Sequence, residues 1–330
     1  MKKTNISLMY LGGVLLFVLG FFVGNISKTI PNRELSDFSS ELRLGGKLTN
    51  PLLECEIAVS TITSRKEDFT PELEDFVEEL KESTNISDIA VYFRDLNNGP
   101  VIGVNQQELY APASLLKVPV MIAYLKWSED EPDVLEERIL YETPMDLGFT
   151  QEFAPLVPLE IGKTYSAKDL IENMVRYSDN QALLLLYNRL PSKYQEDLFR
   201  LVGIDVSLIT DPKAVLSVRR YSIFFRILFN ASFLSRTHSE YALKLLTETT
   251  FTGGIRAGVP EEITVAHKFG ERKITNDIQQ FHDCGVVYFP DHPYMLCIMT
   301  RGENPQELIS AIKDISTFVY KEIERQYGQD

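Results

Sequence analysis

The segment Ser114-Leu-Leu-Lys117 places a hydroxyl and an amine three residues apart. Side chains at i and i+3 of a helix share one face, so this lysine can take the proton of a serine that attacks a carbonyl. Pro112 and Ala113 precede Ser114 and put it in the first turn of a helix predicted for residues 113–128. There the positive helix end and burial would favour an oxyanion and lower the pKa of Lys117. The segment predicts acyl transfer through Ser114.

The chain contains a second copy of this spacing, Ser310-Ala-Ile-Lys313. It lies inside a predicted helix that opens at Pro305, where an ordinary exposed serine and lysine explain it fully. The spacing alone is therefore a weak signal for catalysis, and other motifs must support the choice of Ser114.

A second motif, Ser178-Asp179-Asn180, stands immediately before a helix predicted for residues 181–190. Serine, aspartate and asparagine are preferred residues at helix N-caps, so capping explains one of the three without any catalytic role. The other two are left as candidates for proton transfer and substrate binding.

A third motif, Lys268-Phe269-Gly270, ends a strand predicted for residues 263–269. A lysine on a strand followed by glycine lets a substrate backbone pass close to a fixed positive charge. An edge-strand lysine before a turn glycine is the plain alternative.

Hydrophobic periodicity predicts strands near both ends of the chain with helices between them. The predicted strands are 89–94, 101–104, 263–269, 285–289 and 294–300, and the predicted helices are 71–80, 113–128, much of 167–246 and a long closing helix from Pro305. This order predicts an α+β fold in which an antiparallel sheet, built from both ends of the domain, is flanked by helices and packs against a helical subdomain.

The three motifs occur in the order S-x-x-K, S-D-N, K-x-G, separated by 64 and 90 residues. In this the chain resembles the penicillin-recognising serine enzymes, specifically class A β-lactamases and their D-alanyl-D-alanine peptidase relatives. The stretch 252–260, before the third motif, is similar to the same family. The resemblance covers residues 69–330 and implies a β-lactamase/transpeptidase-like fold.

The resemblance also implies a role for each motif residue. Ser114 would be the nucleophile, Lys117 its proton acceptor, and Ser178 a relay to the leaving nitrogen. The substrate-binding residues would be Asn180, Lys268, Gly270 and Glu271, with the N–H groups of Ser114 and Glu271 forming the oxyanion hole. Asp179 would be structural. The expected partner is a peptidoglycan-type peptide or a β-lactam, and we expect no metal and no cofactor.

Two departures from the family pattern bear on function. Class A β-lactamases carry a glutamate after the second motif that activates the deacylating water, whereas the stretch 203–219 here contains only Asp205 and Asp211 as carboxylates. The third motif usually has Thr or Ser between its lysine and glycine, and that hydroxyl binds the substrate carboxylate. Phe269 lacks a hydroxyl, and Glu271 adds negative charge nearby.

Three functions therefore stay open. The first is a slow serine amidase or peptidase that D-alanyl peptides or β-lactams acylate at Ser114. The second is a β-lactamase with an unrecognised water-activating group. The third is a non-catalytic wall-binding module, against which the intact Ser114, Lys117, Ser178 and Asn180 argue.

Composition excludes some partners. The formal net charge is −14 and the isoelectric point near 4.9, so a phosphate backbone would be repelled and no nucleic acid is expected. The four histidines lack metal-ligand spacing. Three cysteines do not make a disulfide framework. Cys284 and Cys297 could approach one another across a hairpin, but we expect them to be ordinary buried thiols.

The amino-terminal residues predict the location of the protein. Lys2 and Lys3 precede an uncharged run whose apolar part, residues 6–24, is 19 residues long. That length favours a single-pass anchor (residues 1–27) over a cleaved signal peptide. The lysines suggest that this end stays inside the cell. We expect residues 28–68 to form a stalk, with the catalytic domain outside the cytoplasm at the cell membrane.

Overall fold

The computed structural model describes residues 46–50, 68–97, 99–145, 152–205 and 215–328. All of them belong to one compact unit, Leu42–Asp330. Within these ranges no helix has the length and apolarity needed to cross a membrane. The predicted anchor, residues 1–27, lies outside the described residues.

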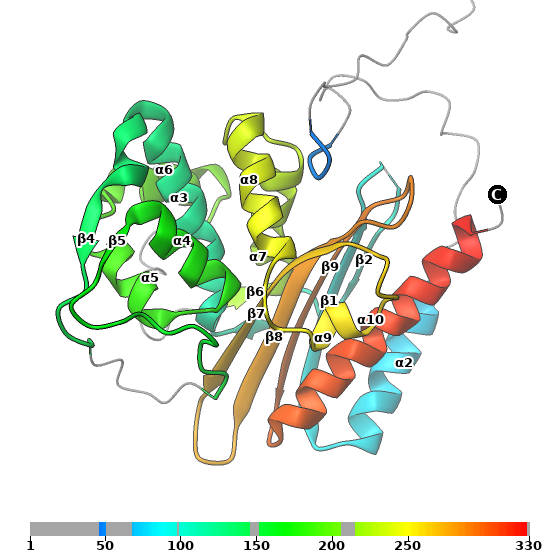
Figure 1. Ribbon diagram of the computed structural model, residues 1–330. Coiled ribbons are helices and arrows are strands. Elements are labelled where there is room, and N and C mark those ends of the chain that lie inside the picture. Colours follow the sequence, from blue (N-terminus) through cyan, green and yellow to red (C-terminus); the bar gives the residue numbers. More distant parts are fainter. Residues whose placement is uncertain (1–45, 51–67, 98, 146–151, 206–214, 329–330) are drawn as a thin grey trace, which may run out of the picture. The chain divides into compact units, whose positions relative to one another are not determined.

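A five-stranded antiparallel sheet forms the centre of the domain (Figure 1). Its order is β2-β1-β9-β8-β7, so β7, which carries the third motif, forms one edge. The strands are β1 Ile86–Asp95, β2 Val101–Val104, β7 Val265–Lys273, β8 Gln279–Val287 and β9 Tyr294–Gly302. The long β1–β9 pairing joins the two ends of the domain, as predicted.

Helices cover both faces of the sheet (Figure 1). Helices α2 (Thr70–Ser83) and α10 (Pro305–Tyr327) lie on one face, with the short α9 (Gly254–Ala257). The other face carries the helical subdomain, which contains α3 Lys117–Asp130, α4 Ala167–Arg176, α5 Asn180–Tyr187, α6 Ser192–Leu201, α7 Val218–Phe229 and α8 Arg236–Thr247. Short elements link them: β3 Leu109–Tyr110, η5 Pro132–Glu136, β4 Arg138–Leu140, β5 Thr164–Ser166 and β6 Leu216–Ser217. The predicted α+β fold is confirmed.

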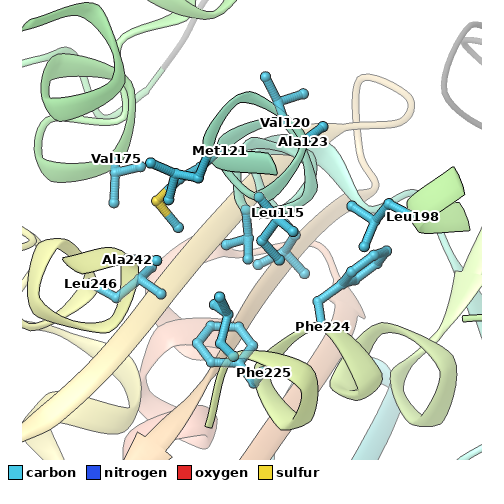
Figure 2. Packing of buried hydrophobic residues seen from close by; sticks show 14 of the residues in the cluster. Leu115, Val120, Met121, Ala123, Val175, Leu198, Phe224, Phe225, Ala242 and Leu246 are labelled. Atoms are coloured by element: carbon cyan, nitrogen blue, oxygen red, sulfur yellow. The ribbon is translucent and has the colours of Figure 1, made fainter. Parts of the chain in front are cut away.

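Each face of the sheet has its own hydrophobic core, because successive strand residues point to opposite sides. One cluster joins the sheet to the helical subdomain, and the other joins it to α2 and α10. In the first, Leu115 lies between α7 residues Phe224 and Phe225 and the helices that carry Met121 and Leu246 (Figure 2). Leu115 directly follows the predicted nucleophile, so this core fixes the position of Ser114.

The start of the predicted helix 113–128 differs from expectation. Residues Ala113–Leu116 form a 3-10 turn, η4, and the α-helix begins only at Lys117. Pro119 has no N–H to donate to the carbonyl of Leu115, which would be its partner four residues back. The hydroxyl of Tyr221 donates to that oxygen instead, at 2.9 Å. Ser114 therefore lies in a 3-10 turn that is held from outside the helix.

Residues 46–50, expected to belong to a stalk, pack against the domain. The backbone N–H groups of residues 47–49 all donate to the carboxylate of Glu240 on α8, at 2.7–3.0 Å. Asn50 donates its N–H to the carbonyl of Phe229 at 2.6 Å. The rest of the expected stalk up to residue 67 lies outside the described residues.

The expectation of free thiols in the sheet is wrong. Cys284 on β8 and Cys297 on β9 are directly opposite each other, with Cα atoms 4.0 Å apart, and form a disulfide. The register of the two strands creates this pairing, which is the hairpin approach that the spacing had left as the alternative.

Candidate active site

Ser114 and Lys117 meet as their spacing predicts. Lys117 Nζ is 3.0 Å from Ser114 Oγ, and the Lys117 side chain is completely buried. Ala113, immediately before the serine, has a φ of 50°. A left-handed backbone is costly for a residue with a side chain, so surrounding contacts hold the turn in place.

The second motif comes to the same place from the turn between α4 and α5. Lys117 Nζ donates to the Ser178 carbonyl and to Asn180 Oδ1, each at 2.6 Å, and lies 3.0 Å from Ser178 Oγ. Ser178 also has a left-handed backbone, with a φ of 55°. This conformation lets its carbonyl and its hydroxyl both face Lys117. Asp179 caps α5 by accepting from the N–H of Ala182, consistent with a structural role.

The third motif completes the cluster. Lys268 Nζ, on β7, donates to Ser178 Oγ at 2.9 Å and to the carbonyl of Phe269 at 2.9 Å. Ser178 Oγ therefore lies between two buried amines. A continuous chain of hydrogen bonds runs from Ser114 through Lys117 and Ser178 to Lys268, although the four residues come from η4, α3, the turn between α4 and α5, and β7.

The burial of the two lysines changes their chemistry. Desolvation lowers the pKa of Lys117 well below its usual value, and the charge of Lys268 lowers it further. Desolvation also lowers the pKa of Lys268, to about 7, although Asp283 and Glu271 oppose the shift. A neutral Lys117 can act as a base, whereas a fixed ammonium cannot.

Gly270 lets β7 approach the turn that carries the nucleophile. A Cβ at this position would lie 3.0 Å from the backbone nitrogen of Leu115 and 3.1 Å from the carbonyl oxygen of Pro112. Such contacts are tighter than side chains normally make, so glycine suits the position. The strand therefore passes beside Ser114, and Glu271 is the next residue along it.

Glu271 is held by a loop from the helical subdomain. The N–H of Phe153 donates to Glu271 Oε1 at 2.9 Å. Burial raises the pKa of Glu271, the hydrogen bond from Phe153 opposes this shift, and the charge of Glu152 adds to it. The sequence pattern did not single out Phe153, because no motif marks a loop residue whose backbone binds a distant side chain.

Phe269 occupies the position where the family usually has a hydroxyl. Its ring packs against Phe251 (ring centroids 4.3 Å apart), Phe281 (5.7 Å) and Phe153 (5.8 Å). The same ring lies 4.1 Å from Lys268 Nζ. An aromatic group therefore covers the lysine where a hydroxyl was expected to meet the substrate.

Other sequence predictions fall outside this cluster. Ser310 and Lys313 are exposed on α10, as the alternative explanation of the second S-x-x-K copy requires. Asp211, one of the two carboxylates in the stretch 203–219, lies outside the described residues. Within the described ranges, no group of three or more His, Cys, Asp or Glu side chains is arranged to hold a metal ion.

Comparison with known proteins places this site in a family. The model of the β-lactamase enzyme family matches residues 72–323. A PBP-A variant in its acyl-enzyme complex with penicillin G matches with a TM-score of 0.65 at 20% identity, covering 79% of this chain and 99% of that one. A class A β-lactamase from Mycobacterium abscessus matches with a TM-score of 0.63 at 23% identity, covering 76% and 98%. A β-lactamase from Francisella tularensis matches with a TM-score of 0.65 at 16% identity, covering 77% and 100%.

The three motifs and the fold thus define a penicillin-recognising type of serine hydrolase. This chain belongs to the β-lactamase enzyme family, as the motifs had indicated.

Proposed function

We propose that the protein is an exported serine hydrolase whose Ser114 is acylated by D-alanyl peptides or β-lactams and which deacylates slowly. The proposal depends chiefly on one observation, the four oxygen atoms within 3.0 Å of Lys117 Nζ. The Ser178 carbonyl and Asn180 Oδ1 can only accept hydrogen bonds, and they are the nearest, at 2.6 Å. A neutral amine gives its two N–H bonds to them and turns its lone pair to a hydroxyl.

The acylation step follows from this arrangement. Ser114 Oγ attacks the amide carbonyl and gives its proton to Lys117 Nζ, while the N–H groups of Ser114 and Glu271 stabilise the oxyanion. As the new C–O bond forms and the C–N bond breaks, Lys117 returns the proton through Ser178 Oγ to the leaving nitrogen. The product is an ester on Ser114 and a free amine, so protons and bonds balance.

Deacylation needs a water molecule activated on the other face of the ester. The water adds to the carbonyl, the C–O bond to Ser114 breaks, and Oγ recovers a proton. The stretch 203–219 contains no glutamate to act as the base. Because general-base assistance typically contributes about 10²–10⁴-fold, its loss leaves a long-lived acyl-enzyme. Lys117 supplies what assistance remains.

The proposed location follows from the amino-terminal sequence. The uncharged run after Lys3 is long enough to anchor the chain in the membrane, and the lysines favour an inward amino terminus. The catalytic domain then faces peptidoglycan outside the cytoplasm.

A chromogenic β-lactam tests the proposal. We expect a stoichiometric burst followed by slow turnover, together with an intact mass increased by one bound drug molecule. Ser114→Ala removes both the burst and the adduct. Ser310→Ala, in the second copy of the motif, is the matched control and behaves like the wild type.

Two results would contradict the proposal. Equal adduct formation by Ser114→Ala and the wild type removes Ser114 from its role. Rapid steady turnover without a burst means that Asp205, Asp211 or a more distant residue is a competent base. The β-lactamase alternative then replaces the slow peptidase.

A further inference from the structure

We infer that the site selects substrates whose carboxyl group beside the third motif is blocked, as an amide, an ester or a continuing peptide chain, and that Glu271 is the specificity-determining residue. The inference rests on the proposed function, because it concerns the group that acylates Ser114. The supporting observations are the contacts that Lys268, Phe269 and Glu271 make with neighbouring groups.

The first observation is that the contacts of Lys268 occupy its ammonium group. Its Nζ donates to Ser178 Oγ and to the Phe269 carbonyl, each at 2.9 Å, and the Phe269 ring lies 4.1 Å away. An ammonium has three N–H bonds, so two hydrogen bonds and one aromatic face use them all. A substrate carboxylate would have to displace one of these contacts before it could pair with Lys268.

The second observation is that no hydroxyl replaces the one lost at Phe269. The ring is fixed among Phe153, Phe251 and Phe281, and its exposure is 5%. It can neither donate a hydrogen bond to a carboxylate nor swing aside without leaving this cluster. The position therefore offers a substrate carboxylate no hydrogen-bond donor.

The third observation is the carboxylate already present in the site. Glu271 directly follows Gly270, and the Phe153 N–H holds its Oε1 at 2.9 Å. When Glu271 is ionised, its charge acts to raise the pKa of Lys117 and of Lys268, against the larger lowering that burial causes. A second carboxylate bound in this partly buried site would be repelled by the ionised form of Glu271, because solvent screens like charges poorly there.

Together these features favour a neutral group. The positive charge that would attract a carboxylate is covered, the hydroxyl that would bind it is absent, and a resident carboxylate repels it. An amide or ester meets none of these penalties. A peptide that continues beyond the bond to be cleaved has the same chemistry, so the inference favours internal peptide bonds over free D-alanyl carboxyl termini.

Acylation rates with matched probe pairs test the inference. The pairs are benzylpenicillin with its methyl ester, and an acylated D-alanyl-D-alanine with its carboxyl-terminal amide. In the wild type we expect the blocked member of each pair to acylate Ser114 faster, measured by intact mass over time. Glu271→Gln keeps an oxygen to accept from the Phe153 N–H but removes the charge, and the ratio of blocked to free rates should fall about tenfold.

Glu303→Gln is the matched control, because Glu303 is exposed on the surface and its loss changes the net charge equally. Its ratio should equal that of the wild type. Faster acylation by the free acids in the wild type, or an unchanged ratio in a folded Glu271→Gln, overturns the inference alone. If no probe of either kind acylates the protein, the proposed function fails and the inference fails with it. If Glu271→Gln does not fold, the ratio of blocked to free acylation rates in the wild type still tests the inference.

Discussion

At the scale of single residues, Ser178 Oγ is the point where two buried amines meet. Lys117 and Lys268 both have no exposed surface, and each lies within 3.0 Å of that hydroxyl. Keeping both charged in this environment would be costly, so burial lowers both pKa values. The same penalty that makes Lys117 a usable base also makes the site a source of instability.

Replacing Lys268 with methionine should therefore stabilise the fold while abolishing acylation. The folded pKa of Lys268 is about 7, below its ordinary 10.5. Between these pH values the unfolded chain binds more protons, so wild-type stability rises with pH, and it falls as pH drops through 7. Lys268→Met removes the cost of burying a charged amine. We expect its free energy of unfolding to exceed that of the wild type by about 1–3 kcal/mol near pH 6.

Urea denaturation from pH 6 to pH 10 measures this effect. The difference in free energy of unfolding between Lys268→Met and the wild type should decrease as pH rises, because the wild-type lysine becomes neutral in the unfolded state as well. Lys313→Met, at the exposed lysine of α10, is the control and should show no such trend. A Lys268→Met variant that is less stable than the wild type at every pH would refute the argument.

At the scale of elements, strand β7 contributes both to the candidate active site and to a hydrophobic core. Lys268 and Gly270 serve the site beside η4, whereas Phe269 belongs to the core between the sheet and helices α2 and α10. The loop that carries Phe153 reaches this strand as well, through a hydrogen bond and ring contacts. Core packing and the third motif thus share three consecutive residues.

Restoring the hydroxyl of the family pattern should be costly for this reason. Phe269→Thr removes a buried ring from contact with three others, and we expect a loss of about 2–4 kcal/mol in the free energy of unfolding. Phe233→Thr, at a half-buried ring on the edge of the other core, should lose less. Denaturant titration of both variants makes the comparison. Equal losses in the free energy of unfolding would mean that the ring contacts of Phe269 stabilise the fold no more than those of a half-buried ring.

At the scale of the whole molecule, residues far apart in sequence form one site. Ser178 and Lys268 are 90 residues apart, and Glu271 binds a loop 118 residues earlier. The domain is also joined to the segment that precedes it, since residues 47–49 donate to Glu240.

Membrane fractionation tests the tether. We expect the full chain to sediment with membranes and to resist extraction by high salt, because apolar burial rather than charge would hold residues 6–24. A chain that lacks residues 1–27 should be soluble and should still acylate. Recovery of the full-length protein as a soluble species, with its amino terminus near Asn25 or beyond, would show a cleaved signal instead.

The sequence by itself determined the motifs, their order and the α+β arrangement. The i, i+3 spacing of Ser114 and Lys117 depends on the local geometry of a helical segment, and the structure keeps it at 3.0 Å. The strand 101–104 matches β2 fully, because turn residues bound a short apolar run. Such features depend on near neighbours in the chain, so a single sequence contains them.

Only the tertiary structure decided the rest. Strand β8 was predicted from 285 but begins at Gln279, because Gln280, His282 and Asp283 are polar and resemble a loop. Gln280 and His282 bond the backbone of Ala111, and Asp283 bonds His267, so burial satisfies them. Partners that lie 16–171 residues away leave no local pattern. For the same reason the disulfide across β8 and β9, the cover that Phe269 forms over Lys268 and the Phe153–Glu271 bond become visible only once the chain is folded.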